Sequence, residues 1–230
     1  MDWTQPIDGY CERVGPDFWA EPLNAVSNLA FLLAAGLAYV VWKQAAEGGR
    51  RERRAVDAAG FALIIVVVVI GIGSFLFHTF ANRWSSLADV LPIAVFIYGY
   101  FALALHRLLG LGRILASLGT LAFLGLSFVA DDVFGPVVGP SSGYVPALLA
   151  LVVIGLLLVL GRGPQGPLVL GAGLVFTVSL SMRIADGPVC EAFPLGTHFL
   201  WHILNATTLG LLLVAAVREG PRRGLKRITP

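Results

Sequence analysis

Two histidines near the C-terminus have a spacing that suits a metal ion. His198 and His202 are four residues apart in the stretch THFLWH. On a helix, this spacing places both imidazoles on one face, a common arrangement for two ligands of one metal. Because an HxxxH pair is a weak signal by itself, a stacked or hydrogen-bonded pair in a helical core is the alternative.

A third histidine lies at the junction of two apolar runs, together with two polar residues. His78 ends one run, Ser74 lies one helical turn before it, and Asp89 opens the next run. Three neutral imidazoles with one open position are what a catalytic zinc ion requires. Asp89 would orient a water molecule or accept its proton, and Ser74 would stabilise an oxyanion. Alternatively, Ser74 bonds to a backbone carbonyl, and Asp89 is a favourable charge at a helix N-terminus.

The elements that carry these residues are predicted to be membrane-spanning helices. The 230 residues are 57% hydrophobic and 13% charged, whereas about 25% charged is typical of soluble domains. With about 20 residues in each span, the length allows about seven spans. The apolar runs fall at 23–42, 58–78, 88–106, 114–130, 144–160, 167–185 and 197–217.

We therefore expect an all-α integral membrane bundle of seven transmembrane helices over residues 23–217. It is preceded by an arm over 1–22 and followed by a basic tail over 218–230. The arm lacks the basic and apolar regions of a secretory signal peptide, so the spans themselves are expected to direct insertion.

The basic residues predict the orientation of the bundle. Thirteen of the 16 Lys and Arg residues lie in the loop 43–54, in the tail, or in the connections that hold Arg107, Arg113 and Arg162. The positive-inside rule places this side in the cytoplasm, and an odd number of spans then places the N-terminus outside. Basic residues that flank spans are attracted by anionic lipid head groups, so no nucleic-acid partner is expected.

This topology sorts the four histidines. His78, His198, His202 and Asp89 all fall at the outer ends of their spans, at one membrane level. His106 falls at the opposite end of the third span, which excludes it from the same site. Since ionisable groups within spans usually mark function, we predict a zinc site at the outer interface.

The two cysteines, Cys11 and Cys190, are both predicted on the outer face. An oxidising exterior would permit a disulfide between the N-terminal arm and the loop before the last span. Two free thiols are the alternative.

Four stretches resemble the alkaline ceramidases, which belong to the CREST superfamily of membrane hydrolases. Gly73-Ser74-x-x-x-His78, followed by Asp89-Val-Leu-Pro92, is similar to the family's GxGSxxFH…DELP block, and the pair in the last span is similar to its closing motif. Tyr10-Cys11-Glu12 and the stretch AEPLNAVSN at 20–28 resemble its N-terminal motif.

The resemblance implies a seven-helix zinc amidase that cleaves ceramide to a sphingoid base and a fatty acid. It assigns zinc to the three outer histidines, the water to Asp89, and assistance at the carbonyl to Ser74. It also supports the disulfide and suggests a calcium site at Asp8, Glu12 and Glu21. A hard cation prefers such oxygens, but a solvated acidic arm explains them equally well.

Three functions compete at this stage. A zinc hydrolase that takes an amide-linked lipid from the membrane is favoured. A metal-binding receptor or sensor would not need Ser74 and Asp89, and a transporter would need ionisable residues at the span centres, which are almost free of them. The composition and short loops favour a multi-pass protein of a bacterial inner membrane with its site near the periplasmic face. In that setting, N-acylated amino-acid lipids are an alternative to ceramide.

Overall fold

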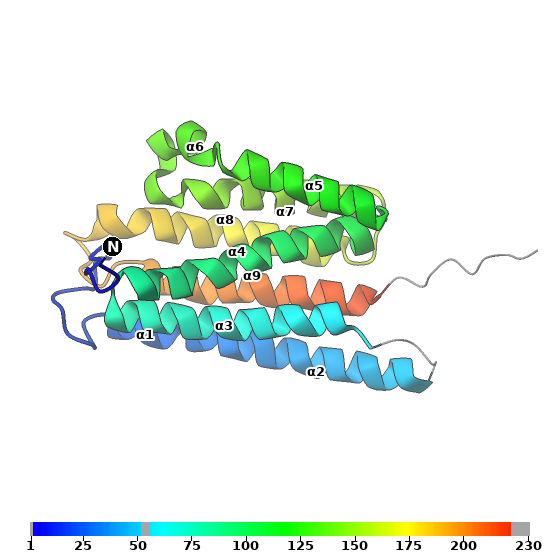
Figure 1. Ribbon diagram of the computed structural model, residues 1–230, viewed down its shortest axis with the longest axis horizontal. Helices are drawn as coiled ribbons and strands as arrows, with labels where there is room; N and C mark the ends of the chain where they lie inside the picture. Colours follow the sequence, from blue (N-terminus) through cyan, green and yellow to red (C-terminus); the bar gives the residue numbers. More distant parts are fainter. Residues whose placement is uncertain (1, 52–55, 222–230) are drawn as a thin grey trace, which may run out of the picture.

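The computed structural model describes residues 2–51 and 56–221, and within them the chain is almost entirely helical. The only strand-like pairing in these ranges is an isolated bridge between Pro6 and Asn82. The helices run roughly along one axis (Figure 1). They are α1 (Pro22–Ser27), α2 (Leu29–Arg51), α3 (Ala58–Phe80), α4 (Arg83–Leu103), the π-helix η1 (Ala104–Leu108), α5 (Arg113–Ser127), α6 (Ala130–Val138), the 3-10 helix η2 (Gly139–Tyr144), α7 (Val145–Leu160), α8 (Gly166–Val189) and α9 (His198–Glu219).

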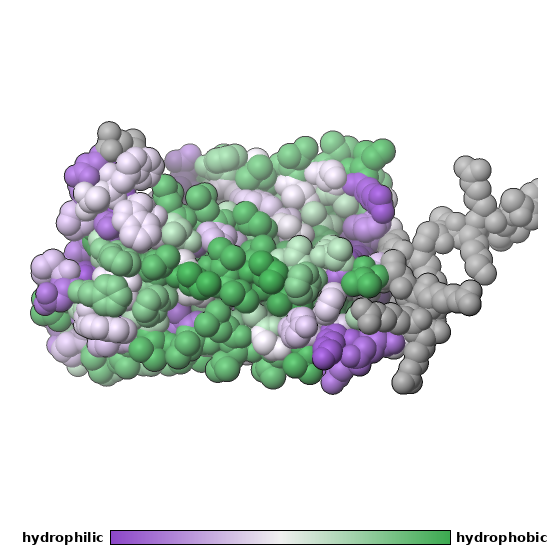
Figure 2. All heavy atoms as spheres, turned by 60° about the horizontal axis from the view of Figure 1, so that its bottom comes forward, coloured by the Kyte–Doolittle hydropathy of each residue, from purple (hydrophilic) through white to green (hydrophobic). Residues whose placement is uncertain are grey.

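The surface of the bundle carries the apolar side chains that a lipid environment requires. Among the described residues, six helical stretches are long and apolar enough to cross a membrane, as in a multi-pass membrane protein. Leu33, Leu37, Ile114 and Phe128 are each more than two-thirds exposed. On the face seen in Figure 2, hydrophobic residues cover the middle and hydrophilic residues gather towards the two ends.

Helix α9 lies at the centre of the packing and is the most buried of the long apolar helices. It contacts α2, α3 and α8, and α3 packs in turn against α2 and α4. The core between these helices includes Phe31, Val67, Ile70 and Leu213, each at most 1% exposed. The site-bearing ends of α3 and α9 are therefore held by a well-packed interior.

Two helix boundaries differ from the sequence-based prediction. The first predicted span, 23–42, is broken at Asn28 into α1 and α2, and α2 continues into the predicted loop as far as Arg51. The third begins at Arg83 instead of residue 88, because Asn82 and Ser85 form a reciprocal capping box. Asp89 consequently lies in the second turn of α4 and does not open the helix.

The fourth and fifth predicted spans, 114–130 and 144–160, also differ in detail. Helix α5 has 15 residues and is the shorter apolar helix beside the six long ones. Residues 131–143, predicted as a connection, form α6 and η2 instead. Ser142 donates to Asp131 across this segment (2.8 Å).

A buried ion pair lies at the end of the bundle opposite the N-terminal arm. Arg107 binds both carboxylate oxygens of Asp57 (2.7 and 2.5 Å), and Asp57 caps α3 by accepting from the backbone of Gly60. Trp42 donates to the Asp57 carbonyl (2.8 Å). Part of the predicted basic segments at this end, namely Arg53, Arg54 and residues 222–230, lies outside the described residues.

Candidate metal centre

Three buried histidines meet at the end of the bundle where the N-terminal arm lies. His78 comes from the last turn of α3, and His198 and His202 from the first two turns of α9. One ring nitrogen from each lies within 4.8 Å of the other two. The side chains are at most 2% exposed. Such a group of imidazoles can hold a metal ion. His106 lies in η1 and bonds to the Leu111 carbonyl, outside this group.

Hydrogen bonds orient two of the rings towards a common point. Glu21 Oε2 accepts from Nδ1 of His78 (2.6 Å). Ser27 gives its hydroxyl hydrogen to the Asn24 carbonyl (2.9 Å), so its oxygen accepts from Nδ1 of His202 (2.8 Å). Both rings therefore keep the lone pair of Nε2 free. A carboxylate or hydroxyl behind a histidine in this way is the usual support of a metal ligand.

Two ring nitrogens of the group also lack a hydrogen-bond partner, which fits a bound cation. Nε2 of His78 and Nδ1 of His198 are buried and have no hydrogen-bond partner in the part of the chain that the structure describes. A buried polar atom without a partner is costly. A bound metal ion would supply the missing partner, and the donor set of three imidazoles suits zinc.

The N-terminal arm covers the histidines and is fixed by a disulfide. Tyr10 stacks on His198 with ring centroids 3.8 Å apart. The next residue, Cys11, is bonded to Cys190, which confirms the predicted bridge. Burial raises the pKa of Tyr10, so its hydroxyl stays neutral at physiological pH.

Asp186 organises the same region, a role that no sequence motif indicates. Its Oδ1 accepts from the backbone of Thr197 (2.7 Å) and His198 (2.9 Å), the first residues of α9. Its Oδ2 accepts from the backbone of Cys11 (3.1 Å). One buried carboxylate thus ties the helix that carries two histidines to the arm above them.

The three carboxylates expected to hold calcium do not meet in the structure. Asp8 is exposed, whereas Glu12 is buried and accepts from the backbone of Leu23 and Asn24 at the start of α1. Glu21 is paired with Arg13 as well as with His78. The positive charge beside Glu21 is therefore a guanidinium of the chain itself, and Glu21 supports a histidine instead.

The carboxyl of Glu21 is kept ionised by these partners. Burial raises its pKa, but hydrogen bonds from His78, Asn24 and Arg13 outweigh that effect, and the net result is a lowered pKa. Arg13 also donates to the carbonyl of His78 (3.1 Å). Arg13 and Glu21 together fix the backbone and the ring of one histidine.

Ser74 and Asp89 face the same cavity as His198 and His202. Helices α3 and α4 approach so closely here that a Cβ on Gly73 would lie 2.0 Å from the Ala88 carbonyl oxygen. At this level Ser74 of α3 and Asp89 of α4 both line the cavity. Oδ1 of Asp89 is buried without a partner among the described residues. Since Asp89 is not in the first turn of α4, the helix-charge alternative does not account for it.

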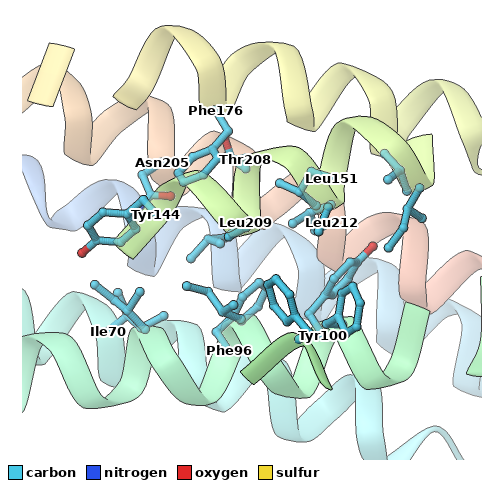
Figure 3. A pocket seen from close by; sticks show the side chains of 18 residues that line it. Ile70, Phe96, Tyr100, Tyr144, Leu151, Phe176, Asn205, Thr208, Leu209 and Leu212 are labelled. Carbon is cyan, nitrogen blue, oxygen red and sulfur yellow. The ribbon is translucent and has the colours of Figure 1, made fainter. Parts of the chain in front are cut away.

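The cavity has a volume of about 140 Å³ and adjoins a second, apolar one. Ser74, Asp89, His198 and His202 line the first. The second has a volume of about 60 Å³ and extends between α4, α5, α7 and α9. Ile70, Tyr144 and Asn205 line both cavities, and Figure 3 shows these three together at one end of the apolar pocket. A polar chamber with an apolar extension suits an amphiphilic ligand.

No protein-family model matches the chain, and comparison with curated proteins finds no match. The interpretation of this site therefore depends on its own geometry. That geometry defines a helical membrane protein with a buried group of three histidines able to bind a metal ion.

Proposed function

We propose that the protein is a zinc-dependent membrane amidohydrolase similar to the alkaline ceramidases. It would cleave the N-acyl amide of ceramide or a related lipid, with water, to a fatty acid and a lipid amine. The observation that carries this proposal is the shared cavity. His198, His202, Ser74 and Asp89, one of whose oxygens is unpaired, line one cavity beside an apolar pocket, and His78 completes the group of three imidazoles.

The proposal includes a seven-span topology with the N-terminus outside. Helix α5, although short, would be the seventh span beside the six longer ones. The metal centre would then lie near the outer face, which in a bacterial inner membrane is the periplasmic one. The disulfide at this end agrees with an oxidising compartment.

Each polar residue has a role in this reaction. His78, His198 and His202 would hold zinc, which supplies Lewis acidity towards the amide carbonyl and lowers the pKa of a water molecule to roughly 7. Asp89 would take the proton of the attacking water and deliver it to the leaving nitrogen. Ser74 would donate a hydrogen bond to the carbonyl oxygen as negative charge develops on it.

The apolar pocket accounts for the acyl part of the substrate. Its lining is almost wholly apolar, with Phe96, Leu209 and Leu212 among the side chains that project into it (Figure 3). The part of an acyl chain next to the amide would enter between α4 and α9, with the amide at the junction marked by Tyr144 and Asn205. A sensor would need only the histidines, so the presence of Asp89 and Ser74 in the same chamber favours the enzyme.

The test is fatty-acid release from a panel of amide lipids by the purified protein and its variants. Asp89→Asn is expected to lower kcat by about 10²- to 10⁴-fold, the usual contribution of acid–base catalysis. Ser74→Ala should cost about 10²- to 10³-fold, as the loss of an oxyanion donor does. Zinc content should be unchanged in both.

Asp132→Asn, an exposed carboxylate in α6, is the matched control and should retain full activity. If zinc is bound but no amide lipid is cleaved, the sensor replaces the enzyme. If zinc content is the same in a His198→Ala, His202→Ala double variant, the metal assignment is wrong.

A further inference from the structure

Arg183 of α8 lines the metal cavity and is the only Lys or Arg among the described residues that do so. Its NH1 donates to the hydroxyl of Ser141 (2.6 Å), which is itself 2% exposed. Its guanidinium lies 5.3 Å from the ring centre of Tyr144 and 5.9 Å from that of Trp201. These contacts hold the charged group in place at the cavity wall.

Two other arginines with largely buried side chains, Arg13 (4% exposed) and Arg107 (7%), are neutralised within the protein. Arg13 is paired with Glu21, and Arg107 with both oxygens of Asp57. Arg183 has no carboxylate within ion-pair distance in residues 2–51 and 56–221, although its charge acts on Asp89 across the cavity. A half-buried guanidinium without an ion-pair partner in direct contact is costly, so a ligand with a negative charge that reaches it would be stabilised there.

The shape and charge of the site select among anions. A guanidinium presents a planar fork that binds a carboxylate through two parallel hydrogen bonds, and aromatic rings beside it fix the plane. The cavity of about 140 Å³ leaves room for only a small head group beside the amide. Asp89 in the same chamber would repel a doubly charged phosphate more strongly than a single carboxylate.

Resting on the proposed function, we propose that the substrate is an N-acyl amino acid, whose carboxylate binds Arg183 while its amide lies at the histidines. The acyl chain would enter the apolar pocket, and hydrolysis would give a fatty acid and a free amino acid. Arg183 is then the residue that sets head-group specificity. It distinguishes an acidic head group from the neutral one of ceramide.

The test compares N-oleoylglycine with N-oleoylethanolamine, which share the acyl chain and the amide and differ only in a carboxylate against a hydroxymethyl group. Binding constants and fatty-acid release are measured for the zinc-loaded, full-length protein in nanodiscs. The wild type should prefer the acid by roughly 10- to 100-fold, the range expected for a charged hydrogen bond. Arg183→Gln should abolish this preference by weakening binding of the acid.

Two further variants keep the test decisive. Arg183→Lys preserves the charge but not the fork, so it should show an intermediate preference. Arg83→Gln removes an arginine from the same end of the bundle that does not line the cavity, and it should behave like the wild type.

The proposal is overturned if the wild type binds the two amides equally. This comparison uses the wild type alone and so does not depend on the folding of any variant. It is also overturned if Arg183→Gln keeps the preference, or if that variant changes only inhibition by oleate, since Arg183 would then bind the product. If neither amide is cleaved, the hydrolase proposal fails, but the binding constants still decide whether Arg183 recognises a carboxylate.

Discussion

Gly73, where α3 and α4 are in contact, is the position at which an added side-chain atom would disturb the geometry of the site most. An alanine Cβ there would lie 2.0 Å from the carbonyl oxygen of Ala88, about 1.4 Å short of ordinary van der Waals contact at 3.4 Å. Because the obstructing atom belongs to the backbone, no side-chain rotation relieves the overlap. The two helices must move apart by about an ångström at the level of Ser74 and Asp89.

We therefore expect Gly73→Ala to damage catalysis more than metal binding. A displacement of about 1 Å between catalytic groups can cost about 10²-fold in rate, and overpacking of this kind costs about 1–3 kcal/mol of stability. Zinc content should persist, since the three histidines come from α3 and α9 and not from α4.

The assays are fatty-acid release, metal analysis and thermal unfolding of the variant in nanodiscs. Gly36→Ala in α2 is the matched control, because a Cβ there meets nothing within 4 Å. It should retain wild-type activity and stability or gain slightly in stability. A Gly73→Ala protein with the rate and stability of the wild type would refute the close approach and its importance for the placement of Ser74 and Asp89.

Three further predictions concern the groups that support the histidines. Glu21→Gln should weaken zinc affinity by about 10- to 100-fold, the usual effect of removing a carboxylate behind a metal-binding histidine; an unchanged affinity in a chelator competition would contradict this role. A Cys11→Ser, Cys190→Ser variant should lose about 2–5 kcal/mol of stability, and an unaltered unfolding temperature in non-reducing buffer would show that the bridge does not stabilise the arm. Asp186→Ala leaves three backbone donors without their acceptor and should cost about 1–3 kcal/mol; a variant with normal stability and normal access of solvent to Cys11 would argue against it.

The residues that the sequence could place were those whose position follows from the spans. Apolar length and the bias of basic residues brought the three outer histidines and Asp89 to one end of the bundle. The structure brings the three histidines together there and closes the disulfide between Cys11 and Cys190. Hydropathy fixes the depth of a residue along the bundle axis, which brings the histidines to one end, whereas the pairing of the two cysteines was supported by the family resemblance.

The supporting groups were not predictable in the same way. The sequence allowed Glu21 to be a calcium ligand or part of a solvated acidic arm, whereas its partners Arg13 and His78 depend on how the arm folds back over α3. In the sequence, Asp186 is one of several acidic residues on the predicted outer face. Its role follows only from its contact with the start of α9. These roles are set by tertiary contacts between distant segments, for which composition and periodicity carry no signal.

The helix boundaries also divide into those that depend on tertiary contacts and those that a local sequence signal indicates. The break at Asn28 coincides with the close approach of α2 to α3, where a Cβ on Gly71 would meet Phe31 and the Asn28 carbonyl. The early start of α4 was readable in principle, since Asn82 followed three residues later by Ser85 is a local capping signal. Hydropathy predicts a loop there because the polar residues 82–86 interrupt the apolar pattern.

The most direct test of the central claim is fatty-acid release from amide lipids before zinc removal, after removal and after zinc is restored. The proposed mechanism predicts that the purified protein carries one zinc ion per chain, loses fatty-acid release with that ion, and regains it on reconstitution. Release that continues without zinc, or a zinc-loaded protein that cleaves no amide lipid, would contradict it.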